Sequence, residues 1–279
     1  MEKIIAAFDG LHYSKSTRDY AIDISRQADA FLTGVFLDDI TYNSFKIYDL
    51  VMKDGVSEKK IRQYKHGDDE LRLQSSIDFE SHCQKAHLKF NIHHDHKIAL
   101  QELTHESIFA DLLIIDGKES LNNYDEKKPS RFIRNLLSMV HCPVMLIPHE
   151  FNSIKKLIFF YDGSPSSVYA IKMVSYMLPF FSDIPVELLT VKPMEDNLHL
   201  PDNKLLKEFM HLHFVNVHYT VLKGLPESEI KTVLSNQDKS SLLVMGAYGR
   251  STLSRWLRSS MADFLIRENK FPIFTAHHS

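Results

Sequence analysis

An internal repeat limits the fold of this chain more than any other feature of its sequence. Three segments of the first half recur in the second: 3–10 (KIIAAFDG) as 156–163 (KLIFFYDG), 111–117 (DLLIIDG) as 241–247 (SLLVMGA), and 141–147 (HCPVMLI) as 270–275 (KFPIFT). The matches keep the same order, so we infer a tandem duplication with domains at residues 1–150 and 151–279. A chain of 279 residues is long enough for two such units, each with its own core.

The first repeat is longer than the second. Asp9 and Asp162 are 153 positions apart, whereas Pro143 and Pro272 are 129 apart. This difference predicts an insertion in the first half, which we place around residues 39–80. Two roles for the insertion stay open, since it would either cover a vacant pocket in the first half or contact a second chain.

Apolar runs of strand length alternate with helical patterns. In the second half they predict strands at 157–161, 186–191, 215–222, 242–245 and 273–276, with helices at 164–178, 203–213, 227–237 and 261–268. The first half follows the same order, with its first two helices at 14–28 and 71–86. Near-continuous apolar strands separated by helices predict an α/β fold, a parallel sheet covered on both faces. The last strands, 144–147 and 273–276, would be exposed edges unless they pair antiparallel, so we expect the halves to pack as a pseudo-dimer.

Composition narrows the class of partner. The net charge of −3 argues against nucleic acid as the main partner, and no apolar run is long enough to span a bilayer. The chain enters its first strand almost at once, which predicts no signal peptide. Two cysteines, Cys83 and Cys142, make no disulfide framework, so a reducing cytoplasm is the expected compartment.

A glycine turn follows the fourth predicted strand of the second half. Gly246 ends that strand, Gly249 and Arg250 follow, and Ser259 and Ser260 open the next helical pattern. A strand end, a glycine turn and a helix start can together surround a phosphate with backbone N–H groups. The segment therefore predicts an anion site at this end of the sheet.

These residues resemble the universal stress protein family in its tandem form, over nearly the whole chain. Nucleotide-binding members carry G-x2-G-x9-G-(S/T) after the fourth strand and an aspartate after the first. Gly246, Gly249, Ser260 and Asp162 match that pattern, the arginine after the second glycine is Arg250, and Cys142-Pro143-Val144 precedes the last strand as in the family.

The resemblance implies two tandem five-stranded parallel sheets of the adenine nucleotide α-hydrolase-like, Rossmann-like kind, which pair through their last strands. It also implies a stress-response protein that binds ATP or a related adenine nucleotide, with Mg²⁺ left open, and that forms a homodimer. Asp162 would accept hydrogen bonds from ribose hydroxyls or hold a metal, or else only stabilise its own turn. Val191 would offer backbone groups to adenine, and Arg250 would pair with phosphate.

One substitution breaks the family pattern in the second half. The third glycine of the motif is Ser259, whose side chain would either narrow the pocket or cap the helix and donate to phosphate. Ser260 supplies a hydroxyl next to it. The intact spacing favours nucleotide binding, while Ser259 favours the alternative that the chain is a nucleotide-free assembly protein.

The first half departs further from the pattern. Lys118, Glu119 and Ser120 follow Gly117 where the second glycine belongs. Glu119 and Asp116 would repel a triphosphate, so we expect this half to keep the fold without binding ATP in the family manner.

The sequence evidence for a metal site, a reactive thiol or a catalytic site is weaker than the evidence for the anion site. The histidines between His82 and His96 are of a residue type that binds zinc, but their spacing is not the tight spacing of a zinc site. The competing interpretation is that these histidines face solvent and bind no metal. Cys83 is expected to be an unreactive surface or half-buried thiol. P-loop, dinucleotide and nucleophile-elbow motifs are absent, so no catalytic residue is predicted; slow ATP hydrolysis is a third, less favoured hypothesis.

Overall fold

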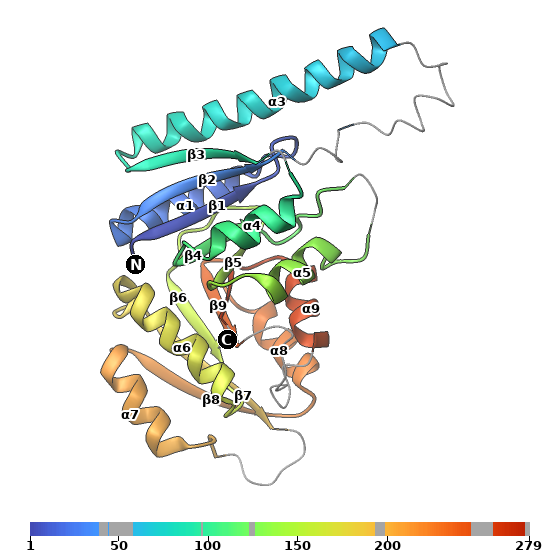
Figure 1. The fold of residues 1–279 in the computed structure, drawn as a ribbon. Coiled ribbons are helices and arrows are strands. Elements are labelled where there is room, and N and C mark those ends of the chain that lie inside the picture. Colours follow the sequence, from blue (N-terminus) through green and yellow to red (C-terminus); the bar gives the residue numbers. More distant parts are fainter. Residues whose placement is uncertain are drawn as a thin grey trace.

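The computed structural model describes residues 1–38, 44, 58–95, 97–122, 126–192, 199–246 and 259–276. The described strands form one ten-stranded sheet in the order β3-β2-β1-β4-β5-β10-β9-β6-β7-β8 (Figure 1). The elements of the first half are β1 Lys3–Phe8, α1 Lys15–Ala28, β2 Phe31–Leu37, α3 Glu58–Lys85, β3 Phe90–Asp95, α4 Ala99–Ser107, β4 Leu112–Asp116, α5 Arg131–Met139 and β5 Val144–Ile147. Those of the second half are β6 Lys156–Phe160, α6 Pro165–Met177, a 3-10 turn Pro179–Phe181, β7 Val186–Lys192, α7 Asn203–His213, β8 Val217–Lys223, α8 Pro226–Ser235, β9 Ser241–Gly246, α9 Ser259–Glu268 and β10 Ile273–Ala276.

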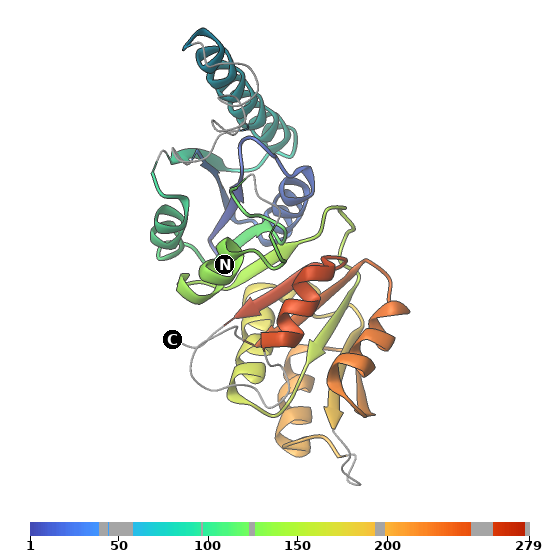
Figure 2. The same ribbon diagram turned by 90° about the vertical axis from the view of Figure 1, so that its right-hand side faces the viewer.

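The last strands of the two halves join the sheet at its middle. β5 and β10 pair antiparallel, with Met145 opposite Phe274, whereas every other strand pair is parallel. In Figure 2 the blue-to-green first half and the yellow-to-red second half meet along these two strands. The predicted parallel sheets and their antiparallel pairing are confirmed. The boundary at residues 150 and 151 stays a prediction, and it falls in the connection between β5 and β6.

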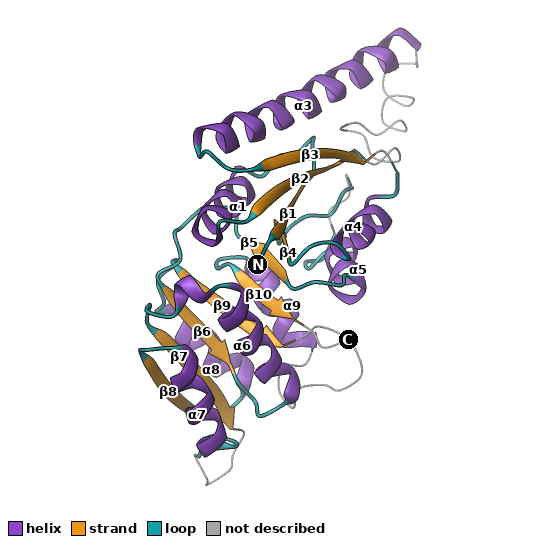
Figure 3. Cartoon of the chain, turned by 60° about the vertical axis from the view of Figure 1, so that its left-hand side comes forward, coloured by secondary structure: helices purple, strands orange, loops and turns teal. Residues whose placement is uncertain are grey.

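Helices cover both faces of the sheet (Figure 3). One core cluster contains residues of α1, α3, α6 and α7, and the other contains residues of α4, α5, α8 and α9. Strand residues alternate between them, so that Ile4 and Phe8 join the first cluster while Ile5 joins the second. Because both faces are buried, each strand is apolar throughout, which explains the unbroken runs in the sequence.

Serines cap the starts of three helices, two of which the sequence predicts, at 14–28 and 164–178. The side chains of Ser14, Ser130 and Ser164 each accept a hydrogen bond from a backbone N–H three residues on, at the starts of α1, α5 and α6. These caps satisfy amides that have no partner within the helix, and each fixes the place where the chain leaves a strand-end loop.

Several element boundaries differ from the sequence prediction by one or two residues, and the start of α3 differs by more. Helix α3 begins at Glu58 rather than Leu71, so much of the predicted insertion extends a 28-residue helix whose first turns project beyond the strands (Figure 1). Strand β8 begins at Val217 rather than Val215, since pairing with β7 starts where Val217 meets Val186. The remaining part of the insertion, 39–43 and 45–57, lies outside the described residues. Among the described helices, none is long and apolar enough to cross a membrane.

Candidate functional site

The chain reverses direction across the sheet at β6 in the second half. From β6 it proceeds to β7 on one side, and after β8 it returns to form β9 on the other side of β6. Crevices that bind ligands form at such switch points, beyond the carboxyl ends of the strands. Asp162 follows β6 and Gly246 ends β9, and the pairing of Phe159 with Val244 places both residues at this carboxyl edge.

Asp162 is almost fully buried at the end of β6. Its Oδ1 accepts a hydrogen bond of 3.0 Å from the backbone N–H of Ser164, so the carboxylate stabilises the turn that begins α6. Gly163 in this turn has φ of +80°, and a Cβ there would lie 2.8 Å from Cβ of Pro201. The turn role expected for Asp162 is therefore present, and a ligand would meet a carboxylate already fixed in place.

Gly246 is buried where the first turn of α6 crosses the end of β9. A Cβ at this position would lie 2.5 Å from Oγ of Ser166 and 2.8 Å from its backbone carbon. The glycine is thus required by packing, whatever binds nearby. Val191 is also buried, next to last in β7 and opposite Leu222 of β8.

The other predicted site residues are described only in part. Gly249 and Arg250 lie outside the described residues, and so does the segment up to residue 258. Ser259 and Ser260 form the first turn of α9, but their side chains are not described. Because α9 leads back to β10, which is parallel to β9, its N-terminus lies at the same edge as Asp162, Val191 and Gly246.

Protein groups occupy the equivalent edge of the first half. Oδ1 of Asp9 accepts from the N–H of Leu11 at 2.8 Å, and Oδ2 lies 3.1 Å from Nδ1 of His12. In place of a glycine turn, Oε1 of Glu119 accepts from the N–H groups of Ser120 and Leu121, at 2.8 and 3.1 Å. A carboxylate thus folds back on the turn where the family pattern has glycine.

Helix α3 covers the neighbouring part of this edge. Oγ of Ser75 donates to the carbonyl of Gly10 at 2.8 Å, and a Cβ on Gly10 would lie 2.9 Å from Cγ of Arg72. Arg72 Nε and His94 Nδ1 each lie 3.1 Å from a different oxygen of the buried Asp38. The C-terminal part of the predicted insertion therefore does cover the first-half edge.

The two edges carry opposite charges at equivalent positions. Matching strand registers align Asp38, after β2, with Lys192, the last residue of β7. In the register of the sheet, Lys192 lies opposite Lys223, the last residue of β8. The aspartate of the first edge is paired with Arg72 and His94, whereas lysines stand at the ends of both β7 and β8 in the second half. Sequence reasoning missed this inversion, although the repeat alignment extended past the strand ends contains it.

The described histidines of β3 are paired with carboxylates, whereas Cys83 of α3 is buried in the core. His93 and His94 lie on β3 and pair with Glu106 and Asp38 respectively, while His96 lies outside the described residues. Within the described ranges, no three His, Cys, Asp or Glu groups are placed to hold a metal ion. The expectation of a surface or half-buried Cys83 is wrong: it is fully buried one turn after Phe79, and burial raises its pKa to about 12.

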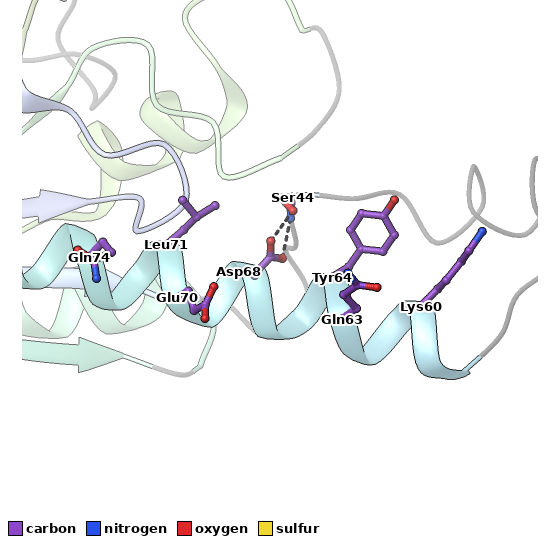
Figure 4. Close-up of a pocket in the computed structure, with 9 residues that line it drawn as sticks. Ser44, Lys60, Gln63, Tyr64, Asp68, Glu70, Leu71 and Gln74 are labelled. Carbon is purple, nitrogen blue, oxygen red and sulfur yellow. Dashed lines mark hydrogen bonds between the residues drawn. The ribbon is translucent and has the colours of Figure 1, made fainter.

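A separate groove of about 650 Å³ runs along α3 (Figure 4). Its lining consists of Ser44, Lys60, Gln63, Tyr64, Gly67, Asp68, Glu70, Leu71 and Gln74. Asp68 accepts from both the N–H and the hydroxyl of Ser44. Among the described residues, its lining is separate from the strand ends where Asp162, Val191 and Gly246 lie.

Comparison with known proteins identifies the fold. No family model matches the chain. A solved universal stress protein from Archaeoglobus fulgidus superimposes with a TM-score of 0.70 at 15% identity, over 99% of this chain and 98% of that one. A protein of unknown function from Pseudomonas aeruginosa has a TM-score of 0.58 at 11% identity, over 99% and 92%.

A sequence relative carries the same family name. A curated universal stress protein from Synechocystis is 22% identical over 167 residues, which is 59% of this chain and 57% of the relative, less than two thirds of its length. The chain is therefore similar in sequence to one universal stress protein and shares its fold with another. The likeness in fold extends over both halves of the chain, which form one continuous sheet.

Proposed function

We propose that this chain is a stress-response protein of the universal stress protein type, and that it binds ATP or a related adenine nucleotide at the carboxyl edge of its second half. The observation that carries the proposal is the switch point between β6 and β9, where the buried residues Asp162 and Gly246 lie at the carboxyl ends of neighbouring strands. Asp162 would accept from ribose hydroxyls or hold Mg²⁺, and Val191 would offer backbone groups to adenine.

The phosphates would lie against the glycine turn. Gly246 would bring the end of β9 to this edge, Gly249 would let the following turn approach phosphate closely, Arg250 would pair with phosphate, and Ser259 and Ser260 would donate at the N-terminus of α9. Lys192 and Lys223 add positive charge along the same edge. The first half would not bind nucleotide, because Glu119, Arg72 and their partners occupy its edge.

A nucleotide-free assembly protein is the second candidate. Two observations favour it: the side chain at Ser259 replaces the third motif glycine, and the two halves share one continuous sheet. We also propose a cytoplasmic homodimer. Since β5 and β10 pair within the chain, a second chain would use other surfaces.

Calorimetric titration of the stripped protein with ATP and Mg²⁺ tests the proposal, with the nucleotide content of the purified protein measured first. We expect one site per chain with micromolar affinity. Asp162→Asn should weaken binding at least tenfold, while the matched first-half variant Asp9→Asn should leave it unchanged. Absence of bound nucleotide and of binding heat would support the assembly protein instead, and equal effects of the two variants would contradict the assignment to the second half.

A further inference from the structure

Helix α3 extends well past the sheet on which it packs. At 1.5 Å per residue its 28 residues span about 42 Å, and its first turns project beyond the strands (Figure 1). In the second part of the helix, Phe79 and Cys83 are fully buried and belong to the first core cluster. The opposite face of that part carries Leu73 and Ile77, one turn apart and 56% and 47% exposed. This apolar pair therefore lies on the side of α3 that faces away from the sheet.

The charge of this outer face changes sign along the helix. Lys59 and Arg62 lie in its first two turns, whereas Glu70 and Glu80 lie on either side of the apolar pair. All four side chains are exposed. They share the face of the apolar pair, because the positions 59, 62, 66, 70, 73, 77 and 80 follow one another in steps of three or four residues. The outer face is therefore basic at its start and acidic in its second part.

Neighbours within α3 hold the acidic side chains on this face. Nε2 of His66 lies 3.7 Å from Oε1 of Glu70, and Glu80 accepts a hydrogen bond of 3.1 Å from Gln84. The side chains of His66 and Glu70 are 76% and 69% exposed, so their pairing adds little to stability. Both acidic groups thus stay accessible to another molecule.

We propose that the outer face of α3 is the contact surface of the homodimer, on which α3 of a second copy lies antiparallel. A two-fold contact must be self-complementary, since each copy supplies the same surface. In antiparallel order the basic start of each helix lies along the acidic part of the other, with Leu73 of both copies near the two-fold axis. Parallel order would instead place like charges together. The inference rests on the homodimer proposed above and names its surface.

The shape of the molecule leaves room for this contact. Helix α3 forms one end of the molecule in both Figure 1 and Figure 2, and its buried side packs on its own sheet. Two copies that meet through their outer faces would therefore lie on opposite sides of the helix pair. Because most of this face is charged or polar, we expect a weak dimer with micromolar affinity that salt weakens further.

Analytical ultracentrifugation of the full chain at micromolar concentrations tests the contact by charge reversal. Lys59→Glu with Arg62→Glu makes both ends of the face acidic, and Glu70→Lys with Glu80→Lys makes both ends basic. Each double variant should raise the Kd of the dimer at least about tenfold, because like charges then face each other. A chain with all four changes inverts the face and should recover the Kd of the wild type.

Lys204→Glu with Lys231→Glu is the matched control. Both lysines are exposed, on α7 and α8, and the net charge changes by the same amount as in Lys59→Glu with Arg62→Glu. The control should dimerise like the wild type. A dimer that persists unchanged in both α3 double variants would overturn this contact surface while the homodimer itself stands.

Two further outcomes would also contradict the contact. Failure of the fourfold variant to recover the dimer would overturn the antiparallel pairing of α3. A wild type that stays monomeric at every concentration would overturn the homodimer together with its surface. Nucleotide titration of the α3 double variants should match the wild type, so the result for the dimer is independent of the proposed nucleotide site.

Discussion

Gly246 ends β9 where the first turn of α6 crosses it, and the contact leaves no room for a Cβ. The motif glycine therefore has a packing role before any ligand is considered. Asp162 is similar, since its carboxylate accepts from the N–H of Ser164 and stabilises the turn at the end of β6. Residues that a family motif marks for binding are here also needed by the fold, so losses of binding and of stability must be measured separately.

Gly246→Ala should lower the free energy of unfolding by about 1–3 kcal/mol, because the new methyl group overlaps the backbone of Ser166. Gly67→Ala is the control: nothing lies within 4 Å of a Cβ there, and alanine should stabilise α3 by up to about 1 kcal/mol. Denaturant unfolding of both variants measures the two changes. Equal effects would contradict the close approach at Gly246.

The length of helix α3 is the main difference between the helices of the first half and those of the second half. Its equivalent α7 has 11 residues against 28 in α3. Arg72 of α3 lies over Gly10 and forms an ion pair with Asp38, which joins the helix to the strand ends. The helix thus fills part of the first-half edge with internal contacts.

Arg72→Ala should destabilise the chain by about 2–4 kcal/mol, because it removes the cation from the buried Asp38 carboxylate. Lys65→Ala, at an exposed position on the same helix, should stay within about 0.5 kcal/mol of wild type. Denaturant unfolding compares the three proteins, and a loss for Arg72→Ala no larger than that of the control would contradict a stabilising role for the ion pair.

The whole molecule is held together through its middle strands. β5 and β10 each have a neighbour on both sides only because they pair with each other, and Phe274 and Met145 are fully buried there. Separation of the halves would expose one edge strand and apolar side chains on each. The tandem arrangement therefore satisfies within one chain an edge that a single unit would have to pair with a second copy.

The isolated second half, residues 151–279, should self-associate through β10 into a dimer. Light scattering coupled to size exclusion measures its mass. Thr275→Pro, which removes a backbone donor from β10, should reduce that dimer to monomer or unfold it. A folded monomer of the unmodified half would contradict the role assigned to this pairing.

The sequence by itself determined the repeat, the alternation of strands and helices, and the pairing of the last strands, because each depends on local apolar patterns and on the order of matched segments. It also placed Asp162, Val191 and Gly246 at strand ends, which the parallel sheet brings to one edge. Ligand binding there stays a prediction, as do the roles of Gly249, Arg250, Ser259 and Ser260.

Only the tertiary structure decided what surrounds those positions. The contact of Ser166 with Gly246, the cover of Arg72 over Gly10 and the burial of Cys83 each join segments that are far apart or depend on which helix face turns inward. The closing of the first-half turn by Glu119 depends on the three-dimensional approach of β1, β4 and α5. Charges and side-chain volumes act through space, so a pattern along the chain names the candidates, while the packing of helices on the sheet determines which of them meet.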